Sequence, residues 1–215
     1  MPIVCLEGPS AVGKTTLARR LAAECGAAVV AELSGAGAAP PIAGSADWFA
    51  DRHAERWLEA RRLAGDGAPF AVLDTDPLKG LWYNPVFADA GWPGVRTVAD
   101  GYRERLRDGR LGVPDRYVVL SATVEQLFAR RAGDPTRTRR GFEGNLRLVE
   151  ALPRWFAELA RVAPGLVATL DTSDPEALVP AVVAAVRAPA AAAPDPLALL
   201  EHMAAWAERE FEGRR

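Results

Sequence analysis

Residues 2–16 read PIVCLEGPSAVGKTT, and this stretch decides the fold class. Residues 2–7 form a short apolar run, which predicts a buried strand. The segment from Gly8 to Thr15 then fits the pattern G-x-x-x-x-G-K-[ST] at every fixed position. A helix pattern follows at once and ends at Gly26. A strand before the motif and a helix after it are the context that a phosphate-binding loop requires, so we expect such a loop here.

Each fixed position of the motif has a physical task. Gly8 and Gly13 allow unusual backbone dihedrals, so that successive N–H groups point inward at a phosphate. The helix that follows adds the positive end of its dipole. Lys14, one of only two lysines beside 24 arginines, would bridge the outer phosphates, and the Thr15 hydroxyl would ligate Mg²⁺. The expected nucleotide-binding residues are Gly8, Pro9, Ser10, Ala11, Val12, Gly13, Lys14, Thr15 and Thr16.

The rest of the chain alternates apolar runs with helical patterns. This alternation predicts a three-layer α/β fold with a doubly wound, five-stranded parallel sheet, whose ligand lies at the carboxyl ends of the strands. Further strands are expected at 29–30, 69–74, 116–122 and 165–173, and helices at about 48–63, 96–108, 123–132 and 174–187. Residues 78–92 appear irregular, and Pro153 predicts a break in the helix that surrounds it.

The expected domain organisation is one core domain with a tail. The core domain covers 1–187 and includes an arginine-rich lid at about 133–145. Residues 188–196 (APAAAAPDP) are typical of a linker, and 197–215 predict a tail with one short amphipathic helix.

Composition excludes several classes of protein. A chain of 215 residues and 23.0 kDa suits one domain, and its net charge of −2 leaves no positive excess for sequence-blind binding to nucleic acid. No apolar run of 18 residues predicts a membrane span, and no signal-peptide pattern is visible, so we expect a cytoplasmic protein. Two cysteines and two histidines make neither a disulfide framework nor a zinc site.

Acidic residues follow the ends of two predicted strands. The strand FAVLD ends in Asp74-Thr75-Asp76, where a carboxylate would lie near the phosphate loop. Asp74 is the first candidate for the base that accepts a hydroxyl proton, and Asp76 is the second and could also hold Mg²⁺ through water. One or both could instead cap the next segment. Glu32 ends the second strand and either faces the same cleft or lies on the surface.

Arginines crowd in and beside one loop flanked by Gly and Pro. Like charges this close repel one another unless an anion lies among them, and guanidinium groups stabilise phosphoryl transfer. The candidates are Arg130, Arg131, Arg137, Arg139 and Arg140, of which the last three lie inside the loop and are preferred. The alternative is a solvated basic loop or a contact with RNA.

Aromatic residues after the acidic strand are candidates for holding a planar substrate. Trp82 and Tyr83 could stack on such a ring, although residues of this kind more often fill a core. The helix at 48–63 could form the opposite wall with Trp48, His53 and Arg56, and a lone histidine on an apolar face is more often structural.

With these features together, residues 2–187 resemble the P-loop small-molecule kinases, which include nucleoside, nucleotide and antibiotic kinases. The segment LDTDP is similar to the aspartate-bearing strand end of nicotinamide riboside kinases. The resemblance implies Mg-ATP as the phosphoryl donor, an arginine-bearing lid at Arg137 to Arg140, and Asp74 or Asp76 near the acceptor hydroxyl. Thymidylate kinases usually carry an Asp-Arg pair at this strand end, and its absence here speaks against dTMP as the acceptor.

Three functional hypotheses remain open at this point. The first is an ATP- and Mg²⁺-dependent kinase of a small metabolite with a hydroxyl or a phosphate, above all a nucleoside or nucleotide. The second is an antibiotic-modifying O-phosphotransferase, which would differ only in the acceptor wall. The third is a nucleotide-dependent switch or ATPase accessory protein whose tail helix docks a partner. A homodimer is compatible with all three, and a nucleic-acid substrate is disfavoured by the acidic balance.

Overall fold

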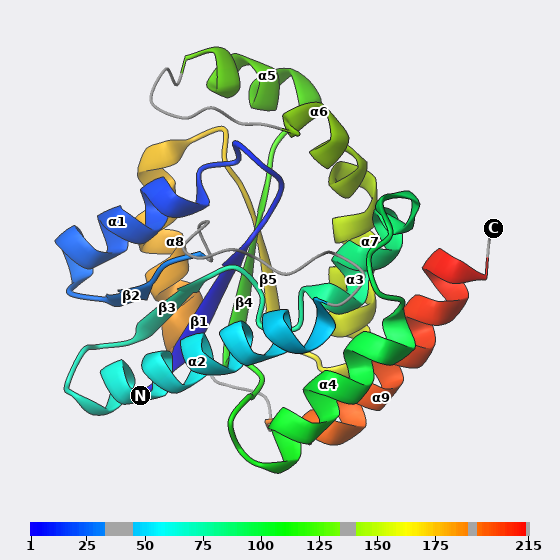
Figure 1. The fold of residues 1–215 in the computed structure, drawn as a ribbon. Coiled ribbons are helices and arrows are strands. Elements are labelled where there is room, and N and C mark those ends of the chain that lie inside the picture. Colours follow the sequence, from blue (N-terminus) through cyan, green and yellow to red (C-terminus); the bar gives the residue numbers. More distant parts are fainter. Residues whose placement is uncertain (33–44, 134–140, 189–192, 214–215) are drawn as a thin grey trace.

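The computed structural model describes residues 1–32, 45–133, 141–188 and 193–213. Its centre is a five-stranded sheet with the order β2-β3-β1-β4-β5 (Figure 1). The strands are β1 (Ile3–Glu7), β2 (Ala28–Val30), β3 (Ala71–Asp74), β4 (Arg116–Ser121) and β5 (Val167–Asp171). Every neighbouring pair is parallel. The predicted five-stranded parallel sheet is therefore confirmed.

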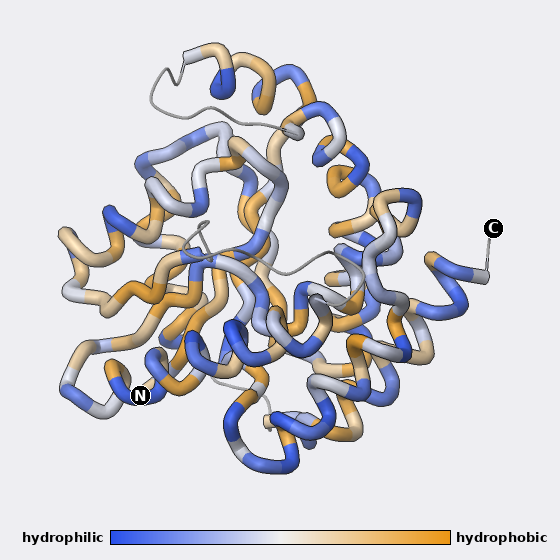
Figure 2. The backbone as a smooth tube through the Cα atoms, viewed as in Figure 1, coloured by the Kyte–Doolittle hydropathy of each residue, from blue (hydrophilic) through white to orange (hydrophobic). Residues whose placement is uncertain are grey.

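Helices cover both faces of the sheet and produce the three layers. One face packs against α1 (Lys14–Cys25), α5 (Val124–Ala132) and α8 (Pro175–Arg187). The other carries α2 (Ala46–Gly65), α3 (Gly80–Val86), α4 (Val95–Arg107), α7 (Arg147–Val162) and α9 (Pro196–Ala207). Short elements are η2 (Ala88–Ala90), α6 (Phe142–Asn145) and η3 (Glu208–Glu212). Hydrophobic residues follow the strands and the helix faces turned toward them, as Figure 2 shows.

Two local predictions were wrong. Residues 78–92 contain the helix α3 and the turn η2, and Leu81 and Trp82 of α3 are fully buried. The helix α7 continues through Pro153. A proline removes only one main-chain donor, and the apolar face that includes Leu152, Trp155 and Phe156 is buried along α7 on both sides of it. Tertiary packing therefore outweighs the local helix-breaking signal at both places.

The predicted tail helix packs against the core domain. The helix α9 lies beside α4 (Figure 1) and also contacts α3 and α7. Its apolar side chains Leu199, Leu200 and Met203 are buried in the same core as α4. Arg103 of α4 forms an ion pair with Glu201 at its edge. The apolar face of α9, which the third hypothesis assigns to the docking of a partner, is therefore covered from within the chain. Among the described residues, no helix is long and apolar enough to cross a bilayer.

Candidate active site

A cavity of about 1370 Å³ opens at the carboxyl ends of the strands. One end is lined by the phosphate-binding loop, Arg130 and Thr172, and we call this end the donor lobe. The other end is lined by Glu32, His53, Arg56, Lys79, Asn84 and the rings of Phe49, Tyr83, Trp92 and Tyr102, and we call it the acceptor lobe. Asp74 lines the same cavity. The cavity therefore lies where the sequence analysis expects the ligand to bind.

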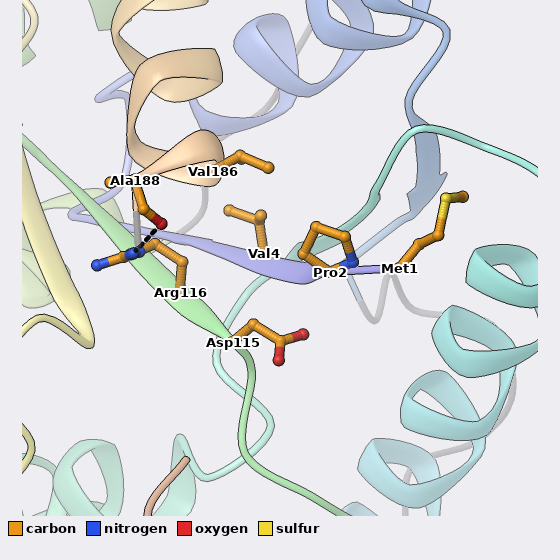
Figure 3. Close-up of a pocket in the computed structure, with 7 residues that line it drawn as sticks. All are labelled: Met1, Pro2, Val4, Asp115, Arg116, Val186 and Ala188. Atoms are coloured by element: carbon orange, nitrogen blue, oxygen red, sulfur yellow. Dashed lines mark hydrogen bonds between the residues drawn. The ribbon is translucent and has the colours of Figure 1, made fainter. Parts of the chain in front are cut away.

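A second cavity, of about 330 Å³, lies at the opposite end of the sheet (Figure 3). It is lined by residues that precede or begin β1 and β4, among them Pro2 and Asp115. Arg116 donates to the carbonyl oxygen of Ala188 at 3.2 Å there. The small cavity lies far from the strand ends that carry the acidic residues, so we assign the chemistry to the large one.

The phosphate-binding loop has the backbone that its sequence requires. Gly8 has a φ of 152°, and a Cβ at this position would lie 2.6 Å from the carbonyl oxygen of Leu120, so no other residue fits. Gly13 has a φ of 108°, and Ala11 also adopts a positive φ, of 69°. Lys14 begins α1, and its Nζ donates to the carbonyl oxygen of Gly8 at 2.7 Å. The loop therefore has the backbone conformation of an anion-binding loop, and the side chain of Lys14 folds back onto it.

Thr15 and Asp74 form a pair beside this loop. The Thr15 hydroxyl donates to Oδ2 of Asp74 at 2.8 Å, across the junction of α1 and β3. The other carboxylate oxygen, Oδ1, is buried and has no hydrogen-bond partner among the described residues. Burial raises the pKa of Asp74, and the hydrogen bond from Thr15 opposes the shift only in part. A buried, half-satisfied carboxylate of this kind needs a proton or a cation.

These two side chains fit Mg²⁺. The ion is usually held by one or two protein oxygens, with water and substrate phosphates completing its shell. No group of three or more His, Cys, Asp or Glu suited to a metal occurs in the part of the chain that the structure describes, so an all-protein cage is not formed there. Thr15 and Asp74, next to a phosphate-binding loop, could supply the protein oxygens for a magnesium ion bound to a nucleotide. The metal would neutralise charge on the outer phosphates.

Glu7 was not predicted as a site residue, and its side chain holds the backbone of the phosphate-binding loop in place. Its side chain is fully buried at the end of β1. One oxygen accepts from the N–H of Gly8 at 2.9 Å and the other from the N–H of Asp76 at 3.0 Å. Lys14 Nζ lies 3.9 Å away. Glu7 therefore ties the start of the phosphate-binding loop to the end of β3. A glutamate that ends an apolar strand directly before Gly8 was the available signal.

Asp76 does not line the cavity. Its carboxylate is fully buried and accepts hydrogen bonds from the N–H of Leu78, the indole of Trp82 and the hydroxyl of Tyr117. Thr75 has a φ of 103°, which breaks the extended alternation and turns Asp76 away from the side that Asp74 faces. The geometry therefore favours an anchoring role for Asp76 over the expected roles as base or Mg²⁺ ligand. Trp82 is likewise fully buried.

We expect Asp76→Asn to lower stability while leaving turnover in place. The amide keeps one acceptor oxygen, so one of the three donors loses its partner, at a cost of about 1–3 kcal/mol. Burial raises the pKa of Asp76 from 3.8 to about 6. The native wild type therefore binds the proton more tightly than the unfolded chain, and its free energy of unfolding falls as the pH rises through this window.

Denaturation of wild type and Asp76→Asn between pH 4 and 7 checks this. The variant should lack that decline, so the difference in unfolding free energy between the two proteins should shrink as the pH rises. A loss of turnover that exceeds the loss of folded protein would contradict the anchoring role.

Glu32 and Lys79 face each other in the acceptor lobe. Lys79 Nζ lies 3.6 Å from Oε1 of Glu32, whose side chain is 44% exposed. Burial raises the pKa of Glu32, but the charges of Lys79 and Lys14 more than offset it, so the pKa lies below its usual value. Glu32 is therefore ionised at neutral pH. Lys79 was not among the expected site residues, although it is the second of only two lysines.

Arg56 is a buried cation that holds the ends of two strands. Its guanidinium donates to the carbonyl oxygens of Ala31 at 3.0 Å and Asp74 at 2.6 Å. One of its nitrogens lies 3.5 Å from Nδ1 of His53. Because a guanidinium only donates, that nitrogen of His53 must accept. Burial lowers the pKa of His53 well below 6.5, and Arg56 adds to the shift, so the imidazole is neutral.

The aromatic expectations divide between cavity and core. Tyr83 lines the cavity, whereas neither Trp48 nor Trp82 does. Trp48 packs edge-on against Phe49, with ring centroids 4.8 Å apart. Phe49 in turn contacts the ring of Trp92 at 5.4 Å, and both rings line the acceptor lobe. The lobe is therefore walled by rings, and two of them, Phe49 and Tyr102, were not expected there.

The arginines that the sequence favoured, Arg137, Arg139 and Arg140, lie outside the described residues. Arg130 is described and lines the donor lobe. It donates to the carbonyl oxygen of Val12 at 3.1 Å and to the hydroxyl and carbonyl oxygens of Thr172 at 2.7 and 2.6 Å. Arg131 points elsewhere and pairs with Glu143 at 3.2 Å. Arg130 therefore links the phosphate-binding loop to the turn after β5.

Solved structures with a similar fold include nucleoside kinases. A deoxyadenosine kinase from M. mycoides with bound dATP superimposes with a TM-score of 0.63, covering 86% of this chain and 98% of that chain at 13% identity. The fold is that of the P-loop kinases. The same kinase with dCMP and a flexible dCDP as products gives a TM-score of 0.58, with coverage of 85% and 97% at 11% identity. No family model matches the sequence, and no curated protein does.

Proposed function

We propose that this protein transfers the terminal phosphoryl group of a Mg²⁺-bound nucleoside triphosphate, ATP in the first instance, to a hydroxyl or phosphate of a nucleoside-like acceptor. The observation that carries the proposal is one cavity that joins a phosphate-binding loop to a carboxylate in a lobe walled by rings. The likeness to deoxyadenosine kinases supports a nucleoside or nucleotide as the acceptor over other hydroxyl compounds.

The donor lobe accounts for the phosphates. The amides between Gly8 and Gly13 and the start of α1 face the anionic groups, and the Lys14 ammonium can leave the carbonyl oxygen of Gly8 for a phosphate oxygen. We assign Thr15 and Asp74 to the metal side of the reaction. The nucleobase of the triphosphate would then lie beyond Val12, toward Arg130 and Thr172, which line the rest of this lobe.

The acceptor lobe supplies the base. Because Asp74 is assigned to the metal, Glu32 is the better candidate to accept the proton of the acceptor hydroxyl. The hydroxyl oxygen then bonds to the γ-phosphorus as the bond between that phosphorus and the β,γ-bridging oxygen breaks, and the nucleoside diphosphate leaves. Lys14 and the loop amides stabilise the charge that develops. Arg137, Arg139 and Arg140 follow α5 in sequence and remain candidates for closing the site over it.

The acceptor ring would lie among Phe49, Tyr83 and Trp92. Aromatic side chains favour offset or edge contacts with planar rings, and the ring of Trp92 lies within 6 Å of both Phe49 and Tyr83. The neutral imidazole of His53 offers a polar edge without a charge to desolvate. A planar acceptor with hydrogen-bonding atoms at its rim therefore suits this lobe.

A thermal-shift screen in the presence of Mg-ADP should identify the acceptor. A ligand at 100 times its Kd stabilises the folded state by about 2.7 kcal/mol, which raises the Tm of a chain of this size by about 5–10 °C. We expect a purine or pyrimidine nucleoside or its monophosphate to give this shift. Shifts with aminoglycosides alone would favour the antibiotic-modifying alternative. No shift with Mg-ADP itself would count against the whole proposal.

A further inference from the structure

The second lysine of the chain is held in the acceptor lobe by a rigid turn. Its backbone N–H donates to the carbonyl oxygen of Asp76 at 3.2 Å, and its carbonyl oxygen accepts from Tyr83 at 2.9 Å. The carboxylate of Asp76 binds the N–H of Leu78 and the indole of Trp82 within the same turn. The buried anchor under this turn therefore fixes where the side chain of Lys79 starts.

The ammonium of Lys79 is fixed at its far end as well. It lies 5.3 Å from the ring centroid of Tyr83 and 5.8 Å from that of Trp82, so two rings support it from α3. Only 21% of the side chain is exposed, and Nζ reaches Oε1 of Glu32 at 3.6 Å. Glu32 follows β2 and Lys79 follows β3, and these strands are neighbours in the sheet. The pair therefore joins two strand ends across the acceptor lobe.

We propose that Lys79 is a positioning residue that acts through Glu32, holding this carboxylate ionised and aimed into the acceptor lobe. The inference rests on the proposed function, in which Glu32 accepts the hydroxyl proton. An ammonium is a compact point charge, whereas a guanidinium grips both oxygens of a carboxylate. In a chain that otherwise uses arginine, a lysine here leaves the carboxylate able to receive a proton.

Other charged groups around Glu32 come from every neighbouring element. Burial lowers the pKa of Lys79, but Glu7 and Glu32 more than offset this, so the ammonium stays protonated at neutral pH. The groups that interact electrostatically with Glu32 are Lys14 of α1, Arg56 of α2, Asp74 and Thr75 at the end of β3, Lys79 at the start of α3 and Tyr83 within α3. Lys79 is the strongest of the cations that hold the pKa of Glu32 down.

The test is the pKa of Glu32 in the full chain, measured by ¹³C NMR of carboxyl-labelled protein and assigned with Glu32→Gln. An opposite charge at this distance lowers a carboxyl pKa by about one pH unit or more. In Lys79→Met the pKa should therefore rise by about one pH unit, and in Lys79→Arg it should stay near the wild-type value. Arg96→Gln, which removes a charge from a side chain that is 84% exposed, should leave it unchanged.

Kinetics then link the pKa to turnover. The acid limb of the pH profile of kcat/KM should move upward in Lys79→Met by the same amount, so that turnover below the limb falls about tenfold. An unchanged pKa of Glu32 in Lys79→Met, or an equal rise in Lys79→Arg, would overturn the role of Lys79. A pKa that shifts while Glu32→Gln keeps full turnover would instead reject Glu32 as the base. The two failures are therefore distinguishable.

Discussion

Lys14→Ala should reduce kcat/KM by about 10²–10³-fold while the fold survives. Lys14 is the one described cation that both begins α1 and reaches back over the phosphate-binding loop, where its Nζ binds the carbonyl oxygen of Gly8. In the reaction its ammonium would stabilise the negative charge that develops on the phosphoryl group during transfer. Interactions that strengthen in the transition state lower kcat when they are lost, and single donors of this kind account for about 10²–10³-fold.

The fold should tolerate the change because the loop does not depend on the lysine side chain. Gly8 and Asp76 keep their backbone bonds to Glu7, and these bonds leave Glu7 satisfied without its 3.9 Å contact to Lys14. Circular dichroism and Tm should therefore stay close to wild type, and release of nucleoside diphosphate should be measured with the acceptor found by thermal shift. Arg96→Ala, at a side chain that is 84% exposed and does not line the cavity, serves as a charge-loss control. Wild-type turnover in Lys14→Ala would reject the proposed function.

The fold could be predicted because its strands are buried on both sides. A strand of a parallel sheet is then a continuous apolar run, and β3 and β4 are visible as such between helical patterns. The helix α3 could not be predicted, because GLWYNPV mixes glycine, proline and rings and gains its structure from packing. The continuation of α7 through Pro153 could not be predicted either, because the burial of its apolar face outweighs the helix-breaking tendency of proline.

The site was predictable where it lies in one segment and not where it is assembled from several. The phosphate-binding loop is contiguous, so every residue from Gly8 to Thr15 could be named. The pairing of Glu32 with Lys79 depends on β2 lying next to β3, and one sequence does not reveal the strand order. The choice between Asp74 and Asp76 depended on a single positive φ at Thr75. A positive φ at a residue other than glycine cannot be predicted from the residue type.

Asp74→Asn and Glu32→Gln should impair different halves of the reaction. Asp74 accepts from Thr15 at 2.8 Å and keeps a buried oxygen without a partner, so an amide preserves the shape of this pair and removes the charge that a cation needs. We expect the Mg²⁺ concentration for half-maximal turnover to rise about 10–100-fold in Asp74→Asn. Glu32 lies in the acceptor lobe, and Glu32→Gln should lower kcat by about 10²–10⁴-fold at an unchanged Mg²⁺ requirement.

The measurement is a Mg²⁺ titration of initial rates for both variants at saturating triphosphate and acceptor. Asp74→Asn should recover part of its rate at high Mg²⁺, because added metal compensates for weaker binding. Glu32→Gln should not recover at any concentration, since its defect lies in proton transfer. The reverse pattern, with metal rescue of Glu32→Gln and none of Asp74→Asn, would exchange the two assignments. It would make Asp74 the base, and the role inferred for Lys79 would then have no carboxylate through which to act.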